Sequence, residues 1–205
     1  PPGDFGVMHG YMKIPELKKV CHAYGVSINE YLVAVYVWSV YTECMHGMPS
    51  ERPVRVAVPV NLRPYFNSIT TKNFFVMVSA EFHPTKEIYT FEEVLKSVSE
   101  SLRSQISREN LEKLFSYNVS NEKLLAARIV PLFLKNLAMR YVYTTSALAN
   151  TATVTNIGNI SVSEEYRPYV EMFHAFLAMS KGQHLKGTIC SYGDTLVFSF
   201  SYDLT

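Results

Sequence analysis

The sequence has few cysteines and no spacing that would join them. Cys21, Cys44 and Cys190 are the three cysteines in 205 residues, and they form no Cys-x-x-Cys pair. A disulfide framework or a zinc site requires an even or closely spaced set of thiols. We therefore expect reduced thiols that serve mainly as packing residues, and a cytoplasmic protein.

An excess of charge and a long apolar run are also lacking. The 19 basic and 18 acidic residues leave a formal net charge of +1, and no basic cluster is interleaved with aromatic residues. This balance argues against nucleic acid or an acidic membrane surface as a partner. The longest apolar run, residues 31–40, is about half the length of a membrane span. We therefore expect no nucleic-acid partner and no membrane span.

Several motifs that carry chemistry are absent. None of the six histidines lies in His-x-x-x-His or His-Glu-x-x-His spacing, and there is no Gly-x-Ser-x-Gly and no glycine-rich phosphate loop. These absences argue against a metal centre, a nucleophile elbow and a phosphate cradle. We expect no metal and no tightly bound cofactor.

Apolar and aromatic residues are abundant. Hydrophobic residues make up 48% of the chain, with 14 Tyr and 12 Phe, which is enough for a large core with sheet-rich packing. The opening Pro-Pro-Gly-Asp resembles a linker, and the chain stops directly after a strand pattern. We therefore expect residues 1–205 to be one lobe of a longer protein, with residues 1–12 as the remnant of an inter-lobe linker.

Hydrophobic periodicity predicts four helices. A capping box, Ser27 with Glu30, should start the second helix, and Pro131 should kink or break the fourth. The predicted helices span residues 15–25, 28–44, 90–114 and 121–140.

Alternating apolar residues predict strands, and Gly193-Asp194 is typical of a hairpin turn between the last two. Because the helices fall between groups of strands, the order favours a two-layer α/β (α+β) sandwich with a mixed sheet and helices packed on one face. The predicted strands span residues 54–60, 73–82, 152–156, 171–179, 187–191 and 195–202.

Four segments in order resemble a known superfamily. They are residues 17–32, residues 55–64 (Arg-Val-Ala-Val-Pro-Val-Asn-Leu-Arg-Pro), residues 73–75 (Asn-Phe-Phe, with Lys72 where the family has glycine) and residues 153–158 (Thr-Val-Thr-Asn-Ile-Gly). Their order and gaps are similar to the second lobe of CoA-dependent acyltransferases of the chloramphenicol-acetyltransferase fold. That superfamily includes alcohol acetyltransferases and the condensation domains of peptide synthetases.

The resemblance implies a function together with a missing part. These enzymes use His-His-x-x-x-Asp-Gly in the N-terminal lobe, where the second histidine acts as general base. This sequence has no His-His pair. The implied function is acyl transfer from acyl-CoA or a carrier (pantetheine) thioester to an alcohol or amine, with the base in the N-terminal lobe and this chain inactive alone. Acyl-CoA would be a co-substrate.

The resemblance also implies site residues on the 153–158 strand. Thr155 stands where the family has its oxyanion-stabilising serine, with Asn156 beside it. The alternative is a threonine paired within the sheet, where threonine is common. Gly158 would permit a close backbone approach or a bulge.

Three further polar residues belong to the same implied site. In related enzymes the arginine at the position of Arg63 forms a structural ion pair with an aspartate; the alternative is an ordinary surface arginine. Asn61 and Asn73 could orient polar groups, although a purely structural role is the simpler interpretation.

Other functions and partners remain open. The chain could be a non-catalytic condensation-domain-like binding domain, or an interaction domain unrelated to acyl transfer. The expected partners are its own N-terminal lobe, a small acceptor and acyl-CoA. A face left bare by the missing lobe should be an apolar patch, or should be covered in a dimer.

Overall fold

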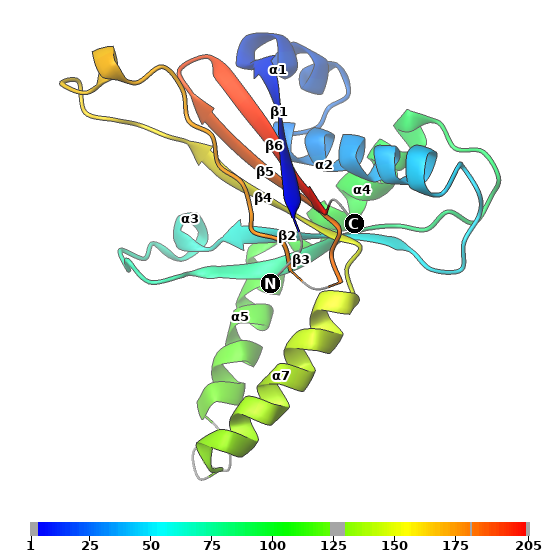
Figure 1. Ribbon diagram of the computed structural model, residues 1–205, viewed down its shortest axis with the longest axis vertical. Coiled ribbons are helices and arrows are strands. Elements are labelled where there is room, and N and C mark those ends of the chain that lie inside the picture. The colour runs from blue at the N-terminus through cyan, green and yellow to red at the C-terminus, as the bar shows by residue number, and fades with distance from the viewer. Residues whose placement is uncertain (1–3, 124–129, 181, 204–205) are drawn as a thin grey trace.

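The sheet is mixed and six-stranded, in the order β1-β6-β5-β4-β2-β3 (Figure 1). The computed structural model describes residues 4–123, 130–180 and 182–203. Strand β4 is parallel to β5 and β2, and the other neighbours are antiparallel. The predicted mixed sheet is confirmed. The strands are β1 (Phe5–Lys13), β2 (Val54–Asn61), β3 (Phe75–Phe82), β4 (Ala152–Asn159), β5 (Leu185–Tyr192) and β6 (Thr195–Asp203).

Helices α1, α2 and α4 cover one face of this sheet. Ser27 and Glu30 form the predicted capping box at the start of α2, and Thr90 and Glu93 form another at the start of α4. The predicted helix 28–44 is confirmed as α2 followed by a π-helical turn. The helical elements are α1 (Ile14–Ala23), α2 (Ile28–Ser39), η1 (Val40–Cys44), α3 (Arg63–Phe66), α4 (Phe91–Gln105), α5 (Arg108–Lys123), α7 (Leu132–Leu148) and the 3-10 turn η2 (Arg167–Tyr169).

The core lies between this helical layer and the sheet. Alternate residues of β2 point toward the helices, as strand geometry requires. Val56 and Val58 of β2, Val37 of α2 and Val98 of α4 are each 1% exposed or less. The two-layer arrangement expected from the order of the elements is therefore confirmed.

The prediction of a linker over residues 1–12 is wrong for residues 5–12, which belong to β1. This strand pairs with β6 along its whole length, from Phe5 opposite Asp203 to Lys13 opposite Thr195. Glycines at positions 6 and 10 hide its pattern. At Gly6 a Cβ would overlap the ring of Tyr202 as it now lies, so that ring would have to move.

The predicted strand 171–179 is also wrong. Residues 171–180, which we call the covering segment, run without regular secondary structure over the sheet face opposite the helices. Side chains of β5 bind its carbonyls: Lys186 Nζ donates to Ala178 O at 2.8 Å and Cys190 Sγ to Phe173 O at 3.3 Å. The segment keeps a strand-like alternation but forms no strand ladder.

The predicted helix 90–114 is two helices, because the chain leaves helical geometry at Ile106 and Ser107 caps α5 through the Asn110 amide. The predicted helix 121–140 falls partly outside the described residues. In the described part Pro131 directly precedes α7, so it marks a break. Both α5 and α7 extend away from the sheet (Figure 1).

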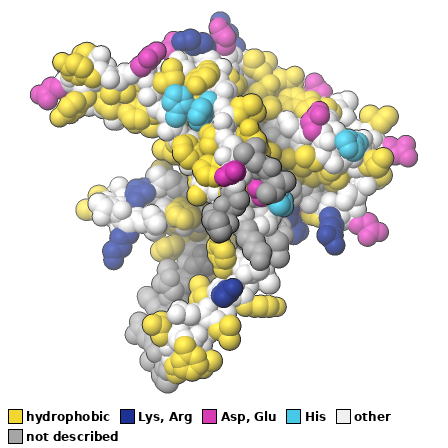
Figure 2. Space-filling view, in the orientation of Figure 1, with side chains coloured by type: hydrophobic (Ala, Val, Ile, Leu, Met, Phe, Trp, Pro, Cys, Tyr) yellow, Lys and Arg dark blue, Asp and Glu magenta, His cyan; other side chains and the backbone are white. Residues whose placement is uncertain are grey.

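Helix α7 exposes many apolar side chains, and Figure 2 shows hydrophobic atoms on the projecting end of the molecule where it lies. Within the described ranges, no helix has both the length and the apolar content needed to cross a bilayer. The large exposed apolar side chains of α7 are Leu132, Phe133, Leu134, Leu137, Met139, Tyr141, Val142 and Tyr143.

Candidate functional site

A cleft of about 590 Å³ lies on the sheet face opposite the helices, at the carboxyl ends of the parallel strands β2 and β4. Such strand ends are the usual ligand-binding edge of α/β sheets. Five of the six residues singled out in the sequence line it, and Gly158 lies just beyond. The lining residues are Pro59, Asn61, Arg63, Asn73, Phe74, Phe75, Met77, Thr153, Thr155, Asn156, Ile157 and Leu177.

Thr155 lies on β4 and is half-buried in the cleft wall. Its neighbour across the ladder is Thr188 of β5. No described residue forms a hydrogen bond with its hydroxyl, so this O–H group is free to donate to a ligand. The backbone of Thr155 belongs to the sheet, whereas its side chain is available to the cleft.

Asn156 and Gly158 form a β-bulge at the end of β4. The pairing with β5 shifts between these two residues, and Asn156 Oδ1 accepts a hydrogen bond from the Gly158 amide at 2.8 Å. Gly158 has a φ of +85°, and no heavy atom lies within 4 Å of the position its Cβ would take. Of the two roles foreseen for this glycine, the structure shows the bulge, while a close backbone approach by a ligand stays a prediction.

Arg63 holds the loop that forms one wall of the cleft. Its Nε donates to Thr70 O at 3.1 Å and its Nη2 to Lys72 O at 2.7 Å. The expected ion pair with an aspartate is not formed by any described residue. Because the guanidinium donates to backbone carbonyls instead, Arg63 is a half-buried residue that fixes the loop, and not an ordinary surface arginine.

Asn61 orients this arginine. Its Oδ1 accepts from the Arg63 amide at 3.1 Å and from Arg63 Nη1 at 3.3 Å. Asn73 is exposed at the opposite side of the same loop and lines the cleft. The following residue, Phe74, anchors the loop by packing edge-on against Phe115 of α5, with ring centroids 5.3 Å apart. Both asparagines therefore lie at the cleft, one of them in a structural role.

The cleft can bind an anionic or oxyanionic group but holds no base. Arg63 is the one charged side chain among the described residues that line it, and none of these residues is a histidine. A guanidinium stays protonated in proteins, so it donates hydrogen bonds but cannot remove a proton. The arrangement can stabilise developing negative charge near Thr155, while proton transfer requires a group from outside this cleft.

Seven lining residues were not singled out in the sequence, among them Thr153 and Leu177. Thr153 lies on the same face of β4 as Thr155, and its hydroxyl donates to Gln183 Oε1 at 3.2 Å. The Thr-x-Thr alternation could have revealed it, because residues two apart share a face of a strand. Leu177 comes from the covering segment, so its place depends on tertiary structure and carried no local signal.

A second polar cluster on the same face is partly buried: His9 is half-buried and His174 is exposed. His9 Nδ1 and Ser199 Oγ are 2.8 Å apart, and the rings of His9 and His174 are 4.5 Å apart. Burial, followed by the nearby His174, lowers the pKa of His9 below its ordinary value. Ser199 is fully buried and its hydroxyl is already paired with His9, so that hydroxyl is not available to a ligand. In the described parts of the chain, no three His, Cys, Asp or Glu side chains are grouped to hold a metal ion.

Comparison with known proteins identifies the fold. The first similar structure is the wax ester synthase/diacylglycerol acyltransferase from Marinobacter aquaeolei VT8, with a TM-score of 0.55 and 16% identity over 97% of this chain and 43% of that one. The nonribosomal peptide synthetase FmoA3, in its AMPPNP-bound form, has a TM-score of 0.62 and 17% identity. That match covers 100% of this chain and 20% of the synthetase chain. The epimerization domain from the third module of tyrocidine synthetase B has a TM-score of 0.57 and 12% identity. That match covers 97% of this chain and 42% of the epimerization-domain chain.

The predicted fold is therefore confirmed: the chain has the fold of this acyltransferase and of these peptide-synthetase structures. No family model and no curated protein sequence matches. The chain spans less than half the length of each of these structures.

Proposed function

We propose that this chain is the C-terminal lobe of an acyltransferase that moves an acyl group from acyl-CoA, or from a carrier-bound pantetheine thioester, to an alcohol or amine. The observation that carries the proposal is the cleft at the ends of β2 and β4, where Thr155 presents an unpaired hydroxyl beside the Arg63 loop. The fold shared with an acyltransferase and with peptide-synthetase domains supports the same reaction class.

The reaction follows from the chemistry of thioesters. The acceptor oxygen or nitrogen attacks the thioester carbonyl carbon, and the carbonyl oxygen becomes an oxyanion in a tetrahedral intermediate. Thr155 donates a hydrogen bond to that oxyanion, which lowers the barrier because the donor is already positioned. Collapse of the intermediate breaks the C–S bond and releases the thiol, which takes the proton removed from the acceptor.

The proton must be removed by a base outside this chain's cleft. A histidine of a second lobe, facing the cleft across the lobe interface, would fill this role. The apolar side chains that α7 exposes are suited to burial against such a lobe or, failing that, in a dimer. The three cysteines are free thiols, as a reducing cytoplasm would keep them, and we propose that compartment.

A second candidate is a non-catalytic binding domain of the same fold. The observation that favours it is the lack of any base among the described cleft residues. Such a domain would bind the pantetheine thioester in the cleft without turning it over. Assays of acyl transfer distinguish the two candidates directly.

The test measures acyl transfer from acetyl-CoA to small alcohols by the full-length protein and by this chain alone. We expect turnover by the full-length protein only. Replacing Thr155 with Val keeps the shape of the side chain and removes its hydroxyl, so kcat should fall by about 10²–10³-fold with little change in KM. Thr155→Ser should restore most of the activity.

Thr153→Val is the matched control, because it removes a hydroxyl from the same strand and the same cleft that is bonded to Gln183. Its kcat should stay within a few-fold of wild type, on the order of an ordinary surface change. An equal loss in both variants would refute the oxyanion role of Thr155. Turnover by this chain alone would refute the assignment of the base to another lobe.

A further inference from the structure

A second pocket lies on the other side of the sheet, under the helical layer. It encloses about 450 Å³ between α2 and the end of the sheet formed by β1, β6 and β5. The helix-facing residues of these strands form its floor, whereas the acyl-transfer cleft uses the opposite face. Its apolar walls include Met12, Leu32, Val35, Leu185, Phe198 and Phe200.

The space exists for two local reasons. Gly10 of β1 faces the pocket without a side chain, and the nearest heavy atom to its missing Cβ is Phe198 O at 3.7 Å. The helix above changes to the π-helical turn η1, whose wider coil also lines the pocket. Single π turns within helices are frequent at functional sites. Ser39, Glu43 and Cys44, which are exposed, form the rim through which the pocket reaches solvent.

Tyr36 places one polar group in this apolar wall. Its ring stacks on Phe200, with centroids 6.3 Å apart and planes 14° apart, and the residue is 3% exposed. The hydroxyl is fully buried, and no described residue is its hydrogen-bond partner. Burial raises the pKa of Tyr36 well above its ordinary value, so the group remains a donor. A buried donor without a partner is costly, and an acceptor that enters the pocket would satisfy it.

The charge of the lining restricts what that acceptor can be. Glu43, at the rim, is the one charged side chain among the described residues that line the pocket. With a carboxylate at the mouth and no cation in the wall, a carboxylate or phosphate ligand would be repelled and left without a counter-charge. A neutral oxygen, as in an alcohol or an ester, can accept from Tyr36 without this cost.

We propose that this pocket binds the aliphatic chain of a neutral, single-chain amphiphile, whose alcohol or ester oxygen accepts a hydrogen bond from Tyr36. The apolar walls and Phe200 surround the chain, and the exposed rim admits it. This inference concerns the face of the sheet opposite the cleft and does not depend on acyl transfer.

The experiment measures equilibrium binding of 1-decanol to this chain, with decanoate as the charged comparison. We expect saturable binding of one 1-decanol and clearly weaker binding of decanoate at pH 7. Tyr36→Phe should weaken 1-decanol binding by about tenfold, the effect of losing one good hydrogen bond. Tyr169→Phe is the matched control, because it removes a phenolic hydroxyl from a residue that is 85% exposed and outside the pocket.

Filling the pocket gives an independent test. Gly10→Val places a side chain in the space and should abolish 1-decanol binding. If this variant does not fold, Gly10→Ala adds a single methyl group at ordinary contact distance and should weaken binding. Binding that does not saturate, or that survives both the Tyr36 and the Gly10 substitutions, would overturn the proposal. Tighter binding of decanoate than of 1-decanol would overturn it as well.

Discussion

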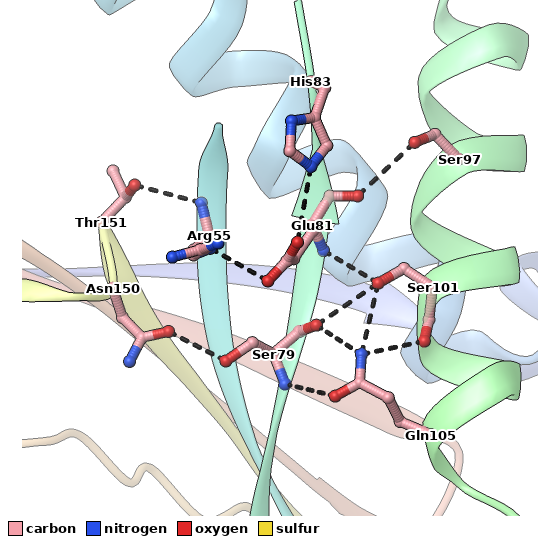
Figure 3. A network of polar contacts seen from close by, with 9 residues as sticks. All are labelled: Arg55, Ser79, Glu81, His83, Ser97, Ser101, Gln105, Asn150 and Thr151. Carbon is pink, nitrogen blue, oxygen red and sulfur yellow. Dashed lines mark hydrogen bonds and ion pairs between the residues drawn. The ribbon is translucent and has the colours of Figure 1, made fainter. Parts of the chain in front are cut away.

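Side chains of α4 form hydrogen bonds with the exposed edge of the sheet. Among these side chains, Gln105 is the one whose loss should lower the stability of the fold most. Among the described strands, β3 has a neighbour on one side only, so its outer backbone groups need other partners. Gln105 Oε1 accepts from the Ser79 amide at 3.1 Å, and its Nε2 donates to Ser79 O at 2.7 Å (Figure 3). Ser101 and Ser97 bind the backbone of Glu81 in the same way.

Gln105→Ala should therefore destabilise the fold by a predictable amount. The Ser79 amide loses its partner, while Ser79 O keeps a weaker hydrogen bond from Ser101 Oγ at 3.3 Å. Leaving one partly buried donor unpaired costs about 1–3 kcal/mol. For a chain of this size, a loss of about 2 kcal/mol lowers Tm by about 4–8 °C. Urea denaturation at pH 7, followed by circular dichroism, measures the change in the free energy of unfolding.

Graded variants separate this hydrogen-bond effect from a general effect of helix substitution. Gln105→Glu can still accept from the Ser79 amide but cannot donate to its carbonyl, so it should fall between wild type and Gln105→Ala. Ser104→Ala removes an exposed hydroxyl that donates within its own helix, to Ser101 O at 2.9 Å, and should change stability by less than about 0.5 kcal/mol. If Gln105→Ala is as stable as Ser104→Ala, the edge-capping argument is wrong.

Two further predictions concern titrating groups. Burial alone would raise the pKa of Glu30, but hydrogen bonds from Arg103 (Nε to Oε1, 2.6 Å) and from Ser27 hold it below its ordinary value. Arg103→Met should therefore lower the free energy of unfolding by about 1–3 kcal/mol at pH 7. Urea denaturation should show this loss shrinking as pH falls below 4.5, the ordinary pKa of a glutamate. An equal loss at pH 7 and pH 4 would contradict the prediction. The lowered pKa of His9 means that the folded state binds fewer protons than the unfolded state, so stability should fall as pH drops below the ordinary value of 6.5. Thermal melts of wild type and His9→Gln across that range test this, and an identical decline in both would exclude His9 as the cause.

The elements with strong local signals could be predicted from the sequence. The Ser27–Glu30 capping box and the Gly193-Asp194 turn depend on residues within four positions of each other, and both form as expected. The alternating valines of β2 likewise reveal a strand with one face in the core. These signals were sufficient because the local preference and the tertiary fold agree.

The elements that were mispredicted depend on distant partners. Strand β1 has glycine at two of its helix-facing positions and gains its stability from pairing with β6, nearly 190 residues away. The covering segment alternates like a strand, but its carbonyls at Phe173 and Ala178 bind side chains of β5, and its one described bridge, between Ser180 and Gln183, is isolated. Neither outcome could be read from local periodicity, which does not specify pairing partners.

The candidate site shows the same division. The resemblance singled out Asn61, Arg63, Asn73 and Thr155 one by one, and the structure places all four at one cleft. It did not predict that Arg63 would bind carbonyls of its own loop, because that depends on the path of residues 67–73. The pocket beside Tyr36 had no sequence signal either, since it is created by the absence of a side chain at Gly10.

Strand β6 links the pocket with the opposite face through its register. Phe198 and Phe200 face the helical layer and form part of the pocket, while Ser199 and Ser201 face the covering segment; both serines are 1% exposed or less. Both faces of β6 are therefore covered. The Phe-Ser alternation places phenylalanines in an apolar layer and serines in a polar layer, and neither face is exposed to solvent. A slip of one residue would exchange the two sets. The two-residue turn at Gly193 and the contact of Tyr202 with Gly6 oppose such a slip at the two ends of the strand.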